Sequence, residues 1–173
     1  MDSLDIFRKI PIFNELNNEE IDRIFTIAQK SLFKSGEMIF SEGDKGDGFY
    51  LIVRGEVKIT IKVNTIGEEI LSLLKGNVHF GEMTLIDDKP RSANAIAETD
   101  VICLYFDKDK FNKIIDDDIS LGNKIRKGFL KTFSKRLRTT DNNVKRIISI
   151  LKNNEKRDNS EGEINHEFNN KEE

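Results

Sequence analysis

The segment "HFGEMTLIDDKPRSANA", residues 79–95, places a glycine, a carboxylate and an arginine close together in the chain. Gly81 permits a positive φ and a close approach of a ligand to the backbone, and Glu82 is a hydrogen-bond acceptor. The residues "EMTLI" can form one helical turn with free N–H groups, while Arg91 offers charge-assisted donors to phosphate oxygens. These features together predict a small pocket for a phosphate joined to a hydroxyl-bearing sugar. The alternative is a solvated hairpin turn at Arg91 with Glu82 as its surface neighbour.

The region around this segment, residues 31–106, has the pattern of short β-strands. Apolar residues there alternate with a period of two, and glycine, asparagine and aspartate separate the runs "EMIF", "FYLIV", "EVKITIKV", "EILSLL" and "VICLYF". Such runs are rich in β-branched and aromatic residues, which favour strands. Many short strands with frequent turns are typical of an antiparallel barrel or a jelly roll. We therefore expect a β domain over residues 31–106.

Helical patterns flank the β region on both sides. In residues 1–30, "NNEEIDRIFTIAQ" sets apolar residues at helical spacing and predicts a helix from Asn17 to Gln29. Helical spacing returns at Asp107 and predicts C-terminal helices over residues 107–151. Residues 152–173 contain one isoleucine and one phenylalanine among polar residues. Because so few apolar side chains cannot offset the entropy of ordering, we expect a disordered tail there.

Composition limits the classes of function. Lys plus Arg (28) nearly balances Asp plus Glu (31), so the net charge of −3 indicates no polyanionic partner. The single cysteine excludes an internal disulfide and leaves too few thiolates for an iron–sulfur cluster or a cysteine zinc site. The chain has no signal-peptide pattern, and no apolar run approaches the roughly 18 residues needed to span a bilayer. We therefore expect a soluble cytoplasmic protein without a membrane span.

Histidines are too few for a metalloenzyme built on a jelly roll. The chain has only His79 and His166, whereas such enzymes bind metal through clustered histidines. We interpret His79 as a polar packing residue, and the sequence offers no Ser-His-Asp set. The sequence therefore predicts a protein that is not an enzyme, with no catalytic residue, no metal and no cofactor.

Two motifs in this chain resemble those of cyclic nucleotide-binding domains. The stretch "FGEMTLIDDKPRSANAIA", residues 80–97, resembles the phosphate-binding cassette of that family. The stretch "EGDKGDGFYLIVRGEVKI", residues 42–59, resembles the glycine-aspartate turn and strand that precede the cassette. The resemblance runs from "IPIFNELNNEEI" to about Val144 and is strongest to the sensor domain of bacterial catabolite-activator-type regulators. It implies a mainly β fold with flanking helices, an eight-stranded antiparallel jelly-roll barrel followed by a long dimerisation helix.

The resemblance also implies roles for individual cassette residues. Gly81 would lend its backbone amide, and Glu82 would accept a hydrogen bond from the ribose 2′-hydroxyl. Arg91 would pair with the cyclic phosphate. Ser92 would add a hydroxyl and a backbone N–H to the same phosphate, and Ala93 would be small enough to let the ligand approach.

Two cassette residues depart from the family pattern. Thr84 stands where alanine is usual, and Asn94 stands where threonine, valine or alanine is common. Neither change removes a phosphate contact that the resemblance implies. The glycine-aspartate turn of residues 43–47 is interpreted as hairpin structure rather than as a ligand contact.

The last helical pattern contains a heptad seam. Its members are separated alternately by three and four residues, and they are Leu130, Phe133, Leu137, Thr140, Val144, Ile147 and Leu151. This spacing predicts a coiled coil, and we expect a parallel homodimer. The alternative is an amphipathic helix that lies on its own barrel.

Thr140 is the polar member of that seam. The resemblance implies that its hydroxyl meets the adenine amino group and selects the base, and the alternative is a polar residue that sets the register of the helix pair. Nine basic residues and one acid, Asp141, surround it between residues 124 and 146. This basic run is either a solvated helix face or a surface for an anionic partner.

The sequence thus favours a cyclic nucleotide sensor, with cAMP as the leading ligand and an unknown protein effector. Catabolite-activator relatives continue into a helix-turn-helix, whereas the helical pattern here ends near Leu151, so we expect no specific DNA binding. One alternative is a degenerate family member that serves as a structural or interaction module without physiological nucleotide binding. Another is a receptor for cGMP or a cyclic dinucleotide.

Overall fold

The computed structural model describes the backbone of residues 7–169 and the side chains of residues 7–153. The chain divides into two units, Met1–Phe129 and Leu130–Glu173, and each is described by itself. None of the helices among the described residues combines the length and the apolar character that a bilayer span requires.

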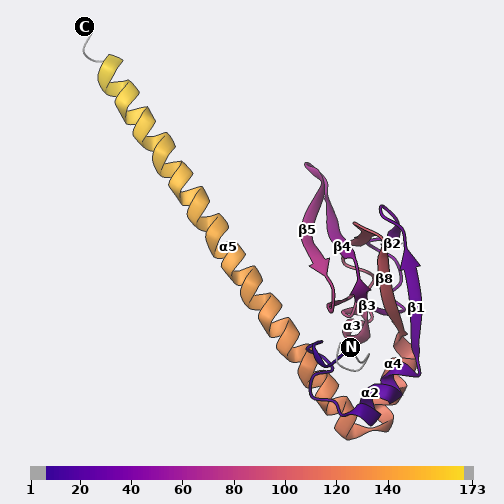
Figure 1. The fold of residues 1–173 in the computed structure, drawn as a ribbon. Coiled ribbons are helices and arrows are strands. Elements are labelled where there is room, and N and C mark those ends of the chain that lie inside the picture. Colours follow the sequence, from indigo (N-terminus) through magenta and orange to yellow (C-terminus); the bar gives the residue numbers. More distant parts are fainter. Residues whose placement is uncertain (1–6, 170–173) are drawn as a thin grey trace. The chain divides into compact units, whose positions relative to one another are not determined.

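The first unit is built on two four-stranded antiparallel sheets (Figure 1). One sheet has the order β1-β8-β3-β6 and the other β2-β7-β4-β5. The eight strands of the described residues are β1 (Ala28–Phe33), β2 (Met38–Phe40), β3 (Gly48–Arg54), β4 (Glu56–Val63), β5 (Gly67–Lys75), β6 (His79–Phe80), β7 (Asn94–Ala97) and β8 (Val101–Asp107). The predicted eight-stranded antiparallel jelly roll is confirmed.

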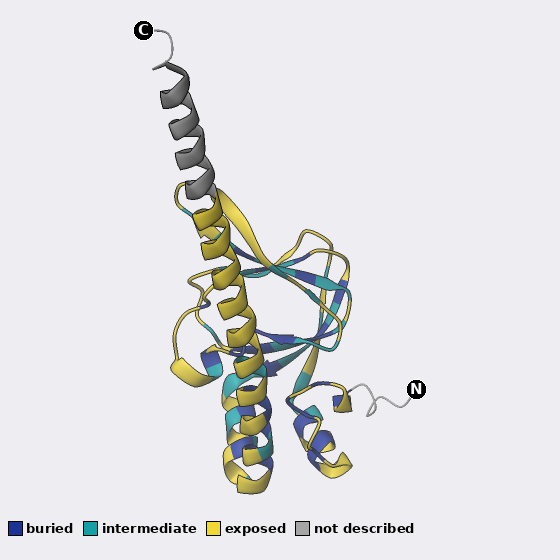
Figure 2. Cartoon of the chain, turned by 90° about the vertical axis from the view of Figure 1, so that its left-hand side faces the viewer, coloured by how far each residue is buried: buried dark blue, intermediate teal, exposed yellow. Residues whose placement is uncertain are grey.

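The core lies between the inner faces of the two sheets (Figure 2). Ile52 and Cys103 from one sheet are fully buried in a cluster with Val57 and Ala97 from the other. Val57 pairs with Ala97 across β4 and β7, so a branched side chain faces a small one. The period-two pattern of the sequence therefore corresponds to alternate residues that point into this core.

Four helices accompany the sheets in the described residues: α2 (Asn18–Phe25), α3 (Thr84–Asp87), α4 (Lys108–Asp117) and α5 (Ile119–Asn169). The sequence predicted a helix as far as Gln29, but α2 ends at Phe25 and β1 begins at Ala28. The reason is that Ala28 pairs with Phe106 of β8, and this ladder prevails over the helical spacing. α5 runs to Asn169 and so includes most of residues 152–173, where the sequence predicted a disordered tail.

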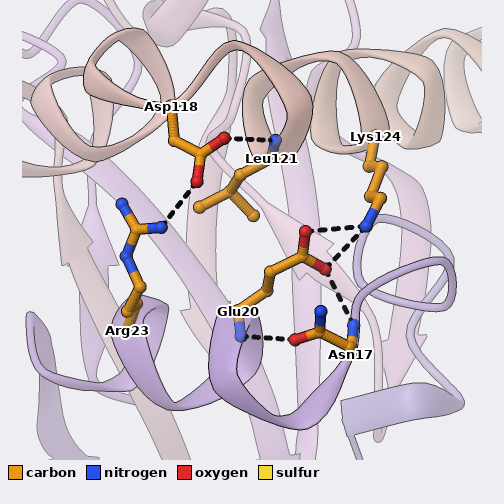
Figure 3. Close-up of polar contacts among 6 residues, drawn as sticks. All are labelled: Asn17, Glu20, Arg23, Asp118, Leu121 and Lys124. Atoms are coloured by element: carbon orange, nitrogen blue, oxygen red, sulfur yellow. Dashed lines mark hydrogen bonds and ion pairs between the residues drawn. The ribbon is translucent and has the colours of Figure 1, made fainter.

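Two ion pairs join α2 to the first turns of α5 (Figure 3). Lys124 Nζ donates to both carboxylate oxygens of Glu20, at 2.7 and 2.9 Å. The same carboxylate accepts from the backbone N–H of Asn17 at 2.8 Å, which completes a capping box at the start of α2. Burial alone would raise the pKa of Glu20, but the hydrogen bonds from Lys124 and Asn17 and the Lys124 charge lower it overall.

The second ion pair caps α5. Asp118 Oδ1 accepts from the backbone N–H of Leu121 at 3.0 Å, while Arg23 Nη1 donates to Asp118 Oδ2 at 2.6 Å. The hydrogen bond from Leu121 lowers the pKa of Asp118, and the one from Arg23 lowers it further. Gly128 is also in close contact with the N-terminal segment, because a Cβ there would lie 2.6 Å from Ile12 Cα. The N-terminal segment therefore fixes the first turns of α5 within the first unit.

Candidate functional site

Residues 79–95 fold as β6, α3 and the start of β7, with the loops that connect them. Gly81 lies directly after β6 with φ +77°, a conformation that favours glycine. A Cβ at Gly81 would lie 2.6 Å from Arg91 Nη1, so a side chain here would also displace the guanidinium. The predicted proximity of the glycine and the arginine is therefore present in the structure.

Arg91 is buried, with 4% of its surface exposed. Its Nη1 donates to the carbonyl oxygens of Gly48 at 2.7 Å and Gly81 at 2.8 Å. Its Nη2 donates to Asp47 Oδ1 at 3.1 Å, and its Cζ lies 4.3 Å from the centroid of the Phe40 ring. These contacts fix the guanidinium and compensate part of the cost of burying its charge.

One edge of the Arg91 guanidinium still has capacity to bind a ligand. Its Nε is buried and has no hydrogen-bond partner in the described part of the chain. A buried donor without a partner costs about 1–3 kcal/mol, which is a reason to expect an acceptor there. Nε and Nη2 lie on the same edge of the guanidinium, and Nη2 has a second N–H besides the one that Asp47 accepts. The Nε–H without a partner suits an oxygen of a phosphate group.

The other predicted cassette residues lie before and after Arg91 along the chain. Glu82 is buried, with 1% of its surface exposed. Ser92 is exposed, and its Oγ lies 3.7 Å from Met83 Sδ, while Ala93 is buried. α3 has only four residues, so Arg91 rather than a helix terminus provides the positive charge of this site. The roles that the resemblance assigns to Gly81, Glu82, Ser92 and Ala93 stay predictions.

Thr140, the predicted selectivity residue, belongs to the second unit, whereas the cassette residues belong to the first. Its side chain is exposed, and its hydroxyl donates to the carbonyl of Arg136 one turn earlier, at 3.1 Å. A contact between Thr140 and a base stays a prediction. The apolar seam residues that surround it are also largely exposed: Leu130 69%, Leu137 63%, Val144 48%, Ile147 56% and Leu151 58%.

The supports of Arg91 on the loop between β2 and β3 were not predicted from the sequence. The glycine-aspartate turn was interpreted as hairpin structure alone, but Asp47 also pairs with Arg91. The carbonyl of Asp47 accepts from Tyr105 Oη at 3.0 Å and from the backbone N–H of Lys108 at 2.9 Å. Burial raises the pKa of Tyr105, and the Asp47 charge raises it further, so the phenol remains a neutral donor. The second acid of "GDKGDG", Asp47, was the signal, because a buried arginine needs an opposite charge.

Comparison with known proteins agrees with this geometry. Residues 30–118 match the family model described as the cyclic nucleotide-binding domain. A cGMP-dependent protein kinase of Drosophila melanogaster (isozyme 2, forms cD5/T2) is 33% identical over 116 residues, which cover 65% of this chain and 12% of the kinase. A CRP-like cAMP-activated global transcriptional regulator of Mycobacterium tuberculosis is 28% identical over 144 residues, which cover 83% of this chain and 62% of the regulator.

A solved structure shows the same fold. The catabolite activator protein of Thermus thermophilus superposes with a TM-score of 0.68 at 31% identity, over 76% of this chain and 60% of that chain. This chain spans less than two thirds of the length of each of these three proteins. The match of the family model, together with the cassette geometry around Arg91, shows that the chain belongs to the cyclic nucleotide-binding domain family.

Proposed function

We propose that this chain is a cyclic nucleotide receptor in which Arg91 binds the cyclic phosphate. The observation that supports this most strongly is the buried guanidinium whose Nε has no partner among the described residues. A phosphate placed on the Nε edge would satisfy that donor and would leave the bonds of Nη1 to Gly48 and Gly81 intact. The pocket binds its ligand and carries out no reaction.

The remaining cassette residues recognise the rest of the nucleotide. Glu82 accepts the ribose 2′-hydroxyl, and its burial makes that bond strong because water does not compete well there. The backbone amide of Gly81 and the hydroxyl and N–H of Ser92 add hydrogen bonds. Ala93 keeps the approach to the phosphate open.

The output runs through α5. The exposed seam of Leu130, Leu137 and Val144 pairs with the seam of a second copy in a parallel homodimer. Thr140 lies in that seam and contacts the base, so it distinguishes adenine from guanine. The dimer signals to a protein effector in the cytoplasm whether a nucleotide is bound.

The leading ligand is cAMP, and cGMP is a second candidate. The name of the M. tuberculosis relative, which covers more of this chain, refers to cAMP, whereas the more identical kinase is cGMP-dependent. Calorimetry with cAMP, cGMP and cyclic di-GMP on ligand-free protein separates these candidates. Thr140→Ala should narrow the preference between the adenine and guanine nucleotides.

Arg91→Ala tests the phosphate contact. Loss of one partner of a buried charge pair costs about 2–5 kcal/mol, so the affinity should fall by roughly 30-fold or more. Arg54→Ala, which removes an exposed arginine at the end of β3, is the matched control and should bind as the parent does. A folded Arg91→Ala protein with unchanged affinity, or a parent protein that binds none of the three nucleotides, would contradict the proposed function.

A further inference from the structure

Thr84, the residue that replaces the usual alanine of the cassette, is buried with 3% exposed. Its hydroxyl donates to the carbonyl oxygen of Gly81 at 3.2 Å. Arg91 Nη1 donates to the same oxygen at 2.8 Å. Thr84 therefore helps to fix the position of an acceptor that orients the guanidinium.

The methyl group of Thr84 contacts the second support of Arg91, the loop between β2 and β3. A Cβ at Gly46 would lie 2.0 Å from Thr84 Cγ2, so the threonine methyl fills the space beside the glycine. Asp47 follows Gly46 and pairs with Arg91 Nη2 at 3.1 Å. Thr84 is thus packed against the loop that holds the carboxylate partner of Arg91.

We propose that Thr84 is a positioning residue for Arg91, a role that rests on the proposed function. The hydroxyl orients the guanidinium through the Gly81 carbonyl, and the methyl orients it through the loop of Gly46 and Asp47. The first contact keeps Nη1 on the Gly81 carbonyl and the second keeps Nη2 on Asp47, so the Nε edge is left toward a phosphate. A donor that is already oriented loses less entropy when the ligand binds, so affinity increases without a new contact to the ligand.

Two substitutions separate the two contacts. Thr84→Val keeps the shape and removes the hydroxyl, and Thr84→Ser keeps the hydroxyl and removes the methyl. We expect Thr84→Val to weaken cAMP or cGMP binding roughly 3- to 10-fold, the usual range for one hydrogen bond, and Thr84→Ser to weaken it less. Thr26→Val is the matched control, because Thr26 also donates to the carbonyl three residues earlier, that of Arg23, but lies at the end of α2.

Gly46→Ala provides a rescue test of the methyl contact. Its added Cβ cannot coexist with Thr84 in the present position, so cyclic nucleotide affinity should fall by roughly tenfold, an overpacking cost. Thr84→Gly removes both Cβ and Cγ2 of Thr84, which lie 2.3 and 2.0 Å from that added Cβ, so the double variant should bind more tightly than Gly46→Ala alone. Equal affinities of these two proteins would overturn the packing part of the proposal.

Arg91→Lys distinguishes positioning from a general contribution to folding. Lysine has no planar fork to orient, so Thr84→Val in this background should change the affinity less than twofold. The positioning role of Thr84 would be overturned if Thr84→Val weakened binding equally in the Arg91→Lys background. It would also be overturned if Thr84→Val had no effect in a protein that keeps Arg91 and binds a cyclic nucleotide. Either result would leave the proposed function intact. A parent that binds no cyclic nucleotide would overturn the proposed function and this inference with it.

Discussion

Both parts of α5 have apolar residues at helical spacing, but the parts differ in what covers those residues. In residues 119–129, Leu121 and Ile125 are fully buried, whereas Leu130 and Leu137 farther along are 69% and 63% exposed. Figure 2 shows buried residues in the first turns and exposed residues in the later described turns. Spacing therefore reveals that a helix has an apolar face, but it does not reveal which surface covers that face.

The first part of α5 is covered by its own unit. Phe129 contacts the rings of Phe49 and His79, with centroids 6.1 and 5.4 Å away. On the side of the N-terminal segment, Glu20 pairs with Lys124. In the later described turns, by contrast, the leucines of the seam remain largely exposed, and we proposed a second copy as their partner.

The largest difference in the free energy of unfolding is expected when one leucine in each part of α5 is replaced by alanine. Leu121→Ala should lower the free energy of unfolding of the first unit by about 3 kcal/mol, because it leaves a cavity in a closed core. Leu137→Ala should lower it by less than about 0.5 kcal/mol, because that leucine is exposed in one chain. Urea unfolding in dilute protein that sedimentation shows to be monomeric measures both. Equal losses would mean that the two parts are covered alike.

A charge in the seam should weaken both dimerisation and nucleotide binding. Leu137→Asp should weaken dimerisation by roughly 100-fold, since each copy would bury a carboxylate, and it should lower nucleotide affinity through coupling of about 1–3 kcal/mol. Sedimentation and calorimetry, with and without cAMP, measure the two effects, and Thr139→Asp on another face of α5 is the control. A folded Leu137→Asp monomer with parental affinity would show that signalling does not pass through the seam.

A smaller effect is expected from the ion pair at the start of α5. Glu20→Gln keeps the size of the side chain and removes its charge, which should cost about 1 kcal/mol because Lys124 remains partly solvated. The neighbouring Glu19→Gln is the control and should change little.

The pH dependence of this pair follows from the lowered pKa of Glu20. Its stabilisation is present above the ordinary value of 4.5 and is lost as the pH falls through the lower folded value. The difference in unfolding free energy between the parent and Glu20→Gln should therefore shrink between about pH 7 and about pH 3. A difference that grows on acidification would contradict the assigned direction.

The sequence predicted the fold and the proximity of Gly81 and Arg91, because both depend on local signals. Period-two runs separated by turns predicted the strands, and Gly81 and Arg91 lie in one short segment that sheet formation closes into a contact. Contacts between distant segments could not be predicted. The pairing of Asp47 with Arg91 depends on how the loop after β2 lies over the cassette, which a single sequence does not determine.

Thr84 and the end of α2 also depend on contacts between distant segments, which the sequence could not predict. The threonine was recognised only as a departure from a family pattern, because its contact with Gly46 arises from packing between two loops. The end of α2 at Phe25 was missed because the pairing of Ala28 with β8 is a tertiary effect that overrides helical spacing.

The most direct test of the account follows the Nε–H of Arg91 by NMR during titration with cAMP or cGMP. The signal is assigned by its loss in Arg91→Lys. If the Nε edge receives the cyclic phosphate, the Nε proton should shift downfield and be protected from exchange at saturation, because it gains an acceptor that it lacks in the described part of the unliganded chain. A nucleotide that binds while this signal stays unchanged would contradict the assignment of Arg91 as the phosphate-binding residue.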